Sequence, residues 1–211
     1  MITDDARVFI VDDDAGVLNS VAFLLRTVGI RAETYSSAQE FLARYDGQSP
    51  GCLLLDLRMP VMSGLELQEK LLAMGSLLPI IFLTAHGDVA TAVKAVKSGA
   101  VDFLQKPFHD QELIDKINRA MQENASIRGA LAGKRDTASR IASLTPREHQ
   151  VLDGVVAGHA NKVIASELGV SQRTVEIHRA RVMKKMEADS LAHLIQMVIG
   201  ARNDHETIDD N

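Results

Sequence analysis

The first 123 residues alternate short apolar runs with longer segments of helical periodicity. The apolar runs are typical of strands buried on both faces of a sheet, and they cover residues 8–11, 53–56, 80–84 and 102–105, with a weaker candidate at 30–35. Helical patterns cover residues 15–28, 38–45, 64–74, 88–98 and 110–123. Five β-α units in this order predict an open parallel sheet with helices on both faces, because crossover connections are almost always right-handed.

Polar residues stand where these predicted strands end: Asp12, Asp13, Asp14, Asp56, Thr84 and Lys106. The carboxyl ends of parallel strands meet at one edge of the sheet, where such folds bind ligands. Each aspartate taken alone could instead cap the helix or turn that follows it. Four matching strand ends favour a common site at that edge.

Carboxylates that lie close together repel one another, and each resists ionisation unless a cation neutralises the group. A hard divalent ion with oxygen ligands meets this need, and Mg²⁺ is the ion we expect, held by Asp12, Asp13, Asp56 and a nearby backbone carbonyl. A carboxylate beside such an ion can attack phosphorus and form an aspartyl phosphate. Lys106 would then pair with the phosphoryl oxygens, and the Thr84 hydroxyl could donate to one of them.

Four motifs, VDDD, LLLDLRMPVMSGLEL, IIFLTAHGD and GAVDFLQKPF, occur in an order and spacing that resemble the receiver domain of two-component response regulators, over residues 5–123. The resemblance implies a flavodoxin-like, doubly wound α/β fold with five parallel strands in the order 2-1-3-4-5. It makes Asp56 the phospho-acceptor and Asp12 with Asp13 the acidic pair. It also makes Arg58 the donor of a metal-binding backbone carbonyl.

The same resemblance assigns the switch residues. It makes Thr84 the switch hydroxyl, Phe103 the switch aromatic residue and Lys106 the phosphate-pairing lysine. The peptide bond between Lys106 and Pro107 matches one that is usually cis in receivers, and a cis bond costs little before proline. Many receivers have tyrosine where this chain has Phe103, and a phenylalanine cannot form the hydrogen bond of a tyrosine hydroxyl.

The net charge of −5 averages two unlike parts. Residues 1–123 carry 11 Lys and Arg against 17 Asp and Glu, a net charge of −6, and residues 124–211 carry 12 against 11, a net charge of +1. Within the second part, residues 161–186 hold six basic and two acidic residues, a net charge of +4. Such a basic stripe suggests nucleic acid as a partner, although charge on a helix is often only a solvated face.

The second part has helical patterns only. Residues 124–142 form either a loose linker or an extension of the preceding helix. Thr145 as N-cap, Pro146 at the first helical position and Glu148 then predict the start of a helix that ends at Gly158. Three further helices are predicted at residues 161–168, 172–186 and 190–201. The first two of these, joined by a glycine-containing turn, predict a helix-turn-helix whose second helix can enter the DNA major groove.

The second helix of this pair has two distinct faces. Its spacing lets Val175, Val182 and Met186 pack inward. The residues expected on the opposite face are Thr174, Ile177, Arg181 and Lys185. Further basic residues that could reach phosphates are Lys162, Arg179 and Lys184.

The stretch LTPREHQVLDGVVAGHANKVIASELGVSQRTVEIHRARVMKKM closely resembles the C-terminal domain of LuxR-type regulators, over residues 143–201. The resemblance implies that Lys162 and Arg179 anchor the DNA backbone. It also implies that three residues face base edges: Glu176, Ile177 and Ala180. The family often has a basic residue where this chain has Glu176. An acid there could accept from a cytosine amino group or could face solvent.

The whole chain resembles a NarL/FixJ-type response regulator. This implies phosphorylation of Asp56 by a partner sensor histidine kinase with Mg²⁺, a double-stranded DNA operator, RNA polymerase as a further partner, and a homodimer when the receiver is phosphorylated. We expect a regulator and not an enzyme, because phosphatases that use such an aspartate usually have a second aspartate two residues on, where Arg58 stands. The alternative is a helix-turn-helix transcription factor whose receiver is a dimerisation module that works without phosphorylation.

The expected organisation is a receiver domain at residues 1–123, a linker at 124–142, a LuxR-type domain at 143–203 and an acidic tail at 204–211. No apolar run approaches the ~18 to 20 residues of a membrane-spanning helix. The N-terminus carries aspartates where a signal peptide needs basic residues. We therefore expect a cytoplasmic protein with no membrane partner.

Overall fold

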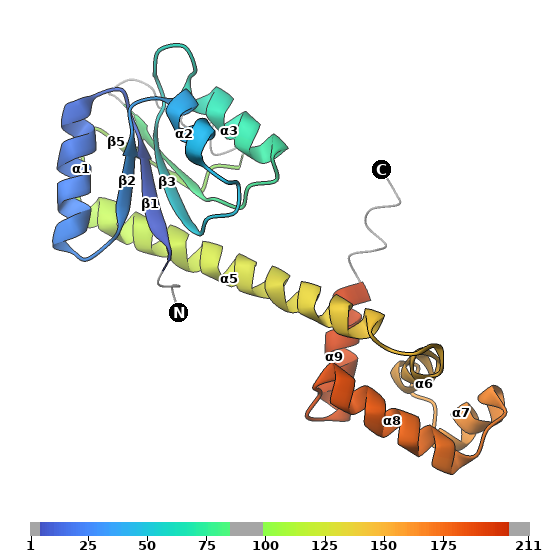
Figure 1. Ribbon diagram of the computed structural model, residues 1–211. Helices are drawn as coiled ribbons and strands as arrows, with labels where there is room; N and C mark the ends of the chain where they lie inside the picture. The colour runs from blue at the N-terminus through green and yellow to red at the C-terminus, as the bar shows by residue number, and fades with distance from the viewer. Residues whose placement is uncertain (1–4, 85–98, 203–211) are drawn as a thin grey trace. The chain divides into compact units, whose positions relative to one another are not determined.

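The computed structural model describes residues 5–84 and 99–202 (Figure 1). The strands of this part form a parallel sheet in the order β2-β1-β3-β4-β5, which confirms the predicted topology. Their bounds are β1 (Arg7–Val11), β2 (Ala32–Tyr35), β3 (Gly51–Asp56), β4 (Ile80–Thr84) and β5 (Asp102–Gln105). The helix predicted at residues 88–98 lies outside the described residues.

The helices that flank the sheet in this part are α1 (Ala15–Thr27), α2 (Ala38–Arg44), α3 (Gly64–Ala73) and α5 (Asp110–Ala142). The first three begin at polar N-cap residues, whose side-chain oxygens accept from backbone amides that would otherwise lack a partner. Asp14 caps α1 by accepting from the amide of Gly16, Ser37 caps α2, and Ser63 forms a capping box with Glu66 at the start of α3. Local sequence therefore determines where these helices start.

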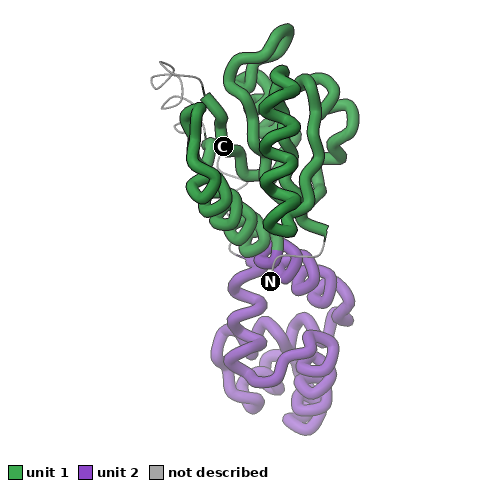
Figure 2. Tube along the Cα trace, turned by 90° about the vertical axis from the view of Figure 1, so that its left-hand side faces the viewer, with its two compact units in different colours: residues 1–128 green, residues 129–211 purple. Residues whose placement is uncertain are grey.

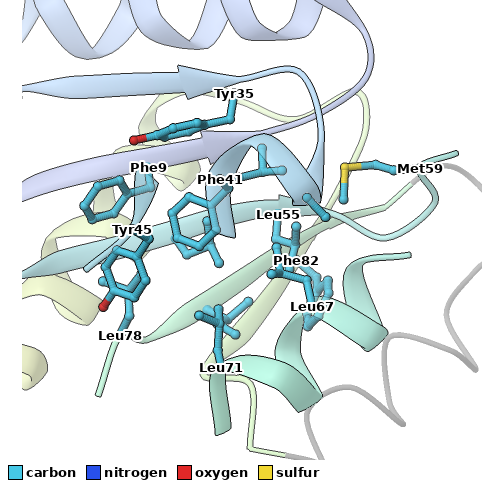
Figure 3. Packing of buried hydrophobic residues seen from close by; sticks show 14 of the residues in the cluster. Phe9, Tyr35, Phe41, Tyr45, Leu55, Met59, Leu67, Leu71, Leu78 and Phe82 are labelled. Atoms are coloured by element: carbon cyan, nitrogen blue, oxygen red, sulfur yellow. The ribbon is translucent and has the colours of Figure 1, made fainter. Parts of the chain in front are cut away.

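An apolar cluster lies on each face of the sheet. Figure 3 shows the cluster beneath α2 and α3, where the ring of Phe9 meets those of Phe41 and Tyr45 edge-on at centroid distances of 5.6 and 5.5 Å. Such aromatic pairs add ~0.5–1.5 kcal/mol to the free energy of unfolding beyond simple burial. The opposite cluster joins Ile10 and Leu54 to the buried sides of α1 and α5. Because β3 is buried at every position, it is the central strand that its apolar run predicts.

Residues 124–142 continue α5 as a helix. Asn124 is 2% exposed, and its Oδ1 accepts from the amide of Gly51 (3.2 Å) while its Nδ2 donates to the carbonyl of Leu77 (2.6 Å). Arg128 donates to the same Oδ1 from its Nε at 3.0 Å. A buried polar group without partners costs ~1–3 kcal/mol, so these bonds stabilise the contact of α5 with the loops at the amino ends of β3 and β4.

The chain divides into two compact units, residues 1–128 and 129–211 (Figure 2). Beyond the end of α5, the second unit contains α6 (Pro146–Val156), α7 (Asn161–Leu168), α8 (Gln172–Met186) and α9 (Leu191–Arg202). The predicted capping box is present, since Thr145 accepts from the amide of Glu148 and the Glu148 carboxylate accepts from the amide of Thr145. Val175, Val182 and Met186 of α8 are buried in the core of this unit, as predicted. None of the helices formed by residues 5–84 and 99–202 has both the length and the apolar character that crossing a membrane requires.

Candidate functional site

Three charged side chains meet at the carboxyl edge of the sheet. Asp12 follows β1, Asp56 ends β3, and the pairing of Val11 with Leu55 makes the two aspartates neighbours. Lys106 follows β5, and its Nζ lies 2.6 Å from Asp12 Oδ2 and 2.6 Å from Asp56 Oδ1. The structure thus brings together three of the polar residues that the sequence placed at strand ends.

Burial controls the electrostatics of this cluster. Asp12 is 1% exposed, and burial raises the pKa of its carboxyl group, although the hydrogen bonds from Lys106 and from the Asp14 amide oppose this shift. Burial alone would lower the pKa of Lys106, but its hydrogen bonds to Asp12 and Asp56 outweigh that effect and raise it. Lys106 therefore stays charged over the physiological range and can neutralise negative charge at this edge.

Backbone amides orient both carboxylates. The amide of Arg58 donates to Asp56 Oδ2 at 2.8 Å, and the amide of Asp14 donates to Asp12 Oδ1 at 2.9 Å. Hydrogen bonds to an ionised acceptor are stronger than neutral ones, so each carboxylate is held by an amide on one oxygen and by Lys106 on the other. Both carboxylates are therefore held in fixed orientations by groups of the protein itself.

Thr84 and Phe103 belong to the two strands next to Lys106: Thr84 ends β4, and Phe103 lies in β5, which Lys106 follows. Thr84 is 1% exposed, and its carbonyl accepts from the amide of Lys106 at 2.8 Å. Phe103 pairs with Phe82 across β4 and β5 and packs, half-buried, against the apolar cluster under α3. The Lys106–Pro107 peptide bond is cis, as the motif implies.

The remaining aspartates of the first motif are not buried with Asp12. Asp13 and Asp14 are both exposed, and the Asp14 carboxylate accepts from the Gly16 amide at 2.7 Å as the cap of α1. Within residues 5–84 and 99–202, no three His, Cys, Asp or Glu side chains come close enough together to hold a metal ion. The role of Asp13 as a metal ligand accordingly stays a prediction.

Gly64 is a residue of this site that the sequence reasoning did not single out. A Cβ atom at this position would lie 2.3 Å from the carbonyl oxygen of Asp56 and 3.0 Å from the ring of Phe82. The Gly64 amide donates to the carbonyl of Leu57 at 3.1 Å, so the start of α3 lies directly against the end of β3. The signal in the sequence was a glycine just after the serine cap, where capping itself does not require one.

The second unit carries the predicted helix-turn-helix. Gly169 ends α7 in the left-handed conformation with φ of 66°, which glycine adopts without strain. Ser171 then caps α8 by accepting from the amide of Thr174 at 3.1 Å. The residues of this region with exposed side chains include Lys162, Glu176, Ile177, Ala180, Arg181 and Lys184. These six are therefore accessible to a ligand, although Glu176 also pairs with Arg173 at 3.5 Å, while α8 keeps its apolar side in the core.

Two basic residues of the predicted DNA-binding set have partners inside the unit. Arg179 is half-buried and donates to Asn161 Oδ1 at 3.0 Å. Lys185 lies 2.7 Å from the buried carboxylate of Glu148 and also donates to the carbonyl of Ser143 at 3.3 Å. The hydrogen bond from Lys185, together with that from the Thr145 amide, lowers the pKa of Glu148 to about 2. The spacing of α8 placed Lys185 on the DNA face, but its ammonium turns toward α6 because the buried Glu148 needs a cation.

Comparison with known proteins agrees with both halves of this description. The family described as "Response regulator receiver domain" matches residues 8–118, and "Bacterial regulatory proteins, luxR family" matches residues 142–198. The transcriptional regulatory protein FixJ of Bradyrhizobium diazoefficiens is 43% identical over 200 residues, covering 95% of this chain and 98% of its own length. FixJ of Rhizobium meliloti is 46% identical over 195 residues, covering 92% of this chain and 96% of its own.

Solved structures give the same result. The response regulator StyR is 45% identical and superposes with a TM-score of 0.85 over 92% of this chain and 98% of its own. Full-length FixJ from B. japonicum is 43% identical, with a TM-score of 0.59 over 94% of this chain and 98% of its own. The chain belongs to the NarL/FixJ-type family of DNA-binding response regulators of two-component systems.

Proposed function

We propose that Asp56 accepts a phosphoryl group from a partner sensor histidine kinase and that this modification controls binding of the chain to a DNA operator. The proposal rests above all on one observation: the Nζ of Lys106 lies 2.6 Å from a carboxylate oxygen of Asp12 and 2.6 Å from one of Asp56. A kinase and DNA are the partners that this family implies. Control of transcription through RNA polymerase, and a cytoplasmic location beside that DNA, belong to the same proposal.

The residues at the sheet edge fit the Mg²⁺ ion that receiver domains generally bind. Two buried carboxylates, Asp12 and Asp56, offer the hard oxygen donors that this ion prefers. Burial raises the pKa of Asp12, and a cation bound beside it would favour the ionised carboxylate. We assign the ion to Asp12, Asp13, Asp56 and the backbone carbonyl of Arg58. When bound, Mg²⁺ supplies positive charge that neutralises the carboxylates and the phosphoryl oxygens.

The protein's own groups supply the remaining chemistry. An oxygen of Asp56 forms a bond to phosphorus while the bond from phosphorus to the donor histidine nitrogen breaks, and the electron pair leaves with the imidazole. Lys106 has three ammonium protons, so it can exchange its bond to Asp56 for one to a phosphoryl oxygen and still hold Asp12. The Arg58 amide keeps the carboxylate oriented during transfer. Arg58 stands where a phosphatase would have an acid/base aspartate, and it has no carboxylate to activate water against the aspartyl phosphate. We therefore propose that the receiver is a switch and not a phosphatase.

The switch acts through Thr84 and Phe103. The phosphoryl oxygens draw the Thr84 hydroxyl inward, and Phe103 follows into the space that it leaves. Phe103 has no hydroxyl to hold an outward position by hydrogen bonding, so its position depends on packing. The state that results favours a homodimer, and two helix-turn-helices then bind half-sites about one turn of DNA apart.

We assign α8 to the DNA major groove. Glu176, Ile177, Ala180 and Arg181 of α8 would face the bases. Thr174, Arg179 and Lys184 of α8, together with Lys162 of α7, would face the DNA backbone. We omit Lys185 because its ammonium is already held by Glu148. The alternative function, a receiver that dimerises without phosphorylation, leaves the contacts of Lys106 with Asp12 and Asp56 without a role.

Phosphorylation by acetyl phosphate tests the proposal. With Mg²⁺ present, acetyl phosphate is expected to raise the dimer fraction in sedimentation and the affinity for duplex DNA in the wild-type chain. Neither change is expected in Asp56→Asn, which preserves size and removes the nucleophile. Equal responses of the two chains would refute the phospho-switch and favour the alternative.

A further inference from the structure

An open cleft of about 670 Å³ lies at the other end of the receiver unit from Asp56. Its walls come from the start of β1, the end of α1 and the start of β2, which is the amino end of the sheet. The cleft is lined by charged and apolar side chains, which include Arg7, Arg26, Arg31, Glu33, Ala22 and Ile30. None of them belongs to the phosphorylation site or to the proposed DNA face, so this cleft is independent of the proposed function.

The cleft is positively charged within an acidic part of the chain. Its three arginines exceed its single acid, although residues 1–123 have a net charge of −6. Glu33 is already used, because its carboxylate pairs with Arg7 and accepts from the Tyr35 hydroxyl at 2.7 Å. Arg26 and Arg31 are exposed, and neither guanidinium has a side-chain partner among residues 5–84 and 99–202. Two guanidinium groups are thus available to an anionic ligand.

The cleft also contains an unpaired strand edge. Among the strands of the described residues, 5–84 and 99–202, β2 lies at one edge of the sheet and pairs with β1 alone. The carbonyls of Arg31 and Tyr35 accept from β1 at 2.9 and 3.2 Å, so the amides and carbonyls of Ala32 and Thr34 point away from the sheet. Such an edge can pair with another extended chain.

We infer that this cleft binds an extended acidic segment of a partner protein, which adds a strand to β2 and pairs its carboxylates with Arg26 and Arg31. Charge complementarity selects the occupant: a second copy of this chain would bring the same arginines against each other. Backbone hydrogen bonds to Ala32 and Thr34 supply affinity, as in other cases of strand addition. Arginine forks bind carboxylates with two parallel hydrogen bonds, which adds specificity for acidic side chains.

The test uses the full chain and a fluorescein-labelled peptide of alternating glutamate and valine, about eight residues long, the length of an ordinary strand. Fluorescence anisotropy is expected to show binding that weakens as salt is raised, because exposed charges are screened beyond about 3 Å at 1 M salt. Arg26→Glu/Arg31→Glu is expected to weaken binding by about tenfold or more, a change of about 1.4 kcal/mol. The matched control Lys70→Glu/Arg119→Glu reverses two exposed charges elsewhere in the unit and should bind as the wild type does.

A second peptide with alternate amides N-methylated keeps the charge but cannot pair along a strand edge. It is expected to bind much more weakly, and this arm needs no variant of the protein. The inference fails if the first peptide does not bind, in which case the arginines only protect the edge. It also fails if both double variants bind equally, because Arg26 and Arg31 then do not contribute to recognition of the peptide. Equal binding of both peptides, or displacement of the first peptide by inorganic phosphate alone, would likewise refute it, since either result indicates a simple anion site.

Discussion

Lys184 and Lys185 are adjacent lysines of α8 that the structure predicts to have different roles. Lys184 is exposed, and its ammonium has no side-chain partner among residues 5–84 and 99–202. The ammonium of Lys185 lies 2.7 Å from the carboxylate of Glu148, whose side chain is 3% exposed. Replacing either lysine by methionine keeps most of the apolar stem and removes the charge. We expect Lys185→Met to destabilise the second unit and Lys184→Met to weaken DNA binding.

The size of each effect follows from the surroundings. Lys185→Met leaves the buried Glu148 carboxylate with the Thr145 amide but without its cation. Losing a hydrogen bond to a charged group costs ~1.5–3 kcal/mol. Because the Lys185 side chain is 38% exposed, water can replace part of the lost interaction, and we expect Lys185→Met to lower the free energy of unfolding by about 1–2 kcal/mol. For a domain of this size each kcal/mol lowers Tm by ~4–8 °C. Lys184→Met should change Tm little, because surface substitutions usually stay within ~0.5 kcal/mol.

Two assays separate these outcomes. Calorimetry of the full chain gives Tm, and titration of duplex DNA at several salt concentrations gives the slope of log affinity against log salt. Losing one phosphate contact should reduce that slope by ~1 in Lys184→Met and leave it unchanged in Lys185→Met. A reduced slope with an unchanged Tm in Lys185→Met would refute the assignment of that lysine to Glu148.

Three further predictions concern Glu148, Gly64 and Gly133. The pKa of Glu148 is lowered from 4.5 to about 2, so its ion pair with Lys185 stabilises the folded chain above pH ~4.5 and is lost as the pH falls toward 2. Glu148→Gln should therefore be less stable than the wild type at neutral pH. Urea titrations should show this difference in the free energy of unfolding shrinking between pH ~4.5 and 2. If Glu148→Gln stayed less stable than the wild type at low pH, packing and not the ion pair would explain the difference. Gly64→Ala should slow phosphorylation by acetyl phosphate severalfold, because its Cβ would lie 2.3 Å from the Asp56 carbonyl oxygen and the backbone must move; a wild-type rate would show that the loop adapts freely. Gly133→Ala has open space for its Cβ and should stabilise α5 by about 1 kcal/mol, seen as slower amide exchange in residues 129–137. Unchanged exchange would contradict that expectation.

The local parts of the fold were predictable because their causes are local. The apolar runs of β3 and β4 and the caps Ser37, Ser63 and Thr145 lie within a few residues of the elements that they define. The gathering of Asp12, Asp56 and Lys106 was also predictable, since parallel strands leave their carboxyl ends at one edge. The parallel topology thus connects residues that are distant in the chain.

Contacts between elements were not predictable from periodicity. The helical continuation through residues 124–142 was an open choice, and its attachment depends on Asn124, which bonds to Gly51 and Leu77. The direction of Lys185 depends on Glu148, which was recognised only as part of a capping box. In each case the partner lies far away in sequence, so the one-dimensional pattern contains no signal for it.

The succession of strands and helices and the family of both domains could be read from the sequence alone, and the residues for phosphoryl chemistry could be predicted from it. These properties depend on hydrophobic period, caps and motif spacing, which are written along the chain. Three results came from the folded structure alone: Lys106 bridges Asp12 and Asp56, Gly64 has no room for a side chain, and Arg26 and Arg31 line a cleft beside the edge of β2. Those results depend on distances between elements, because burial and close approach set which charges need partners and which stay available to a ligand.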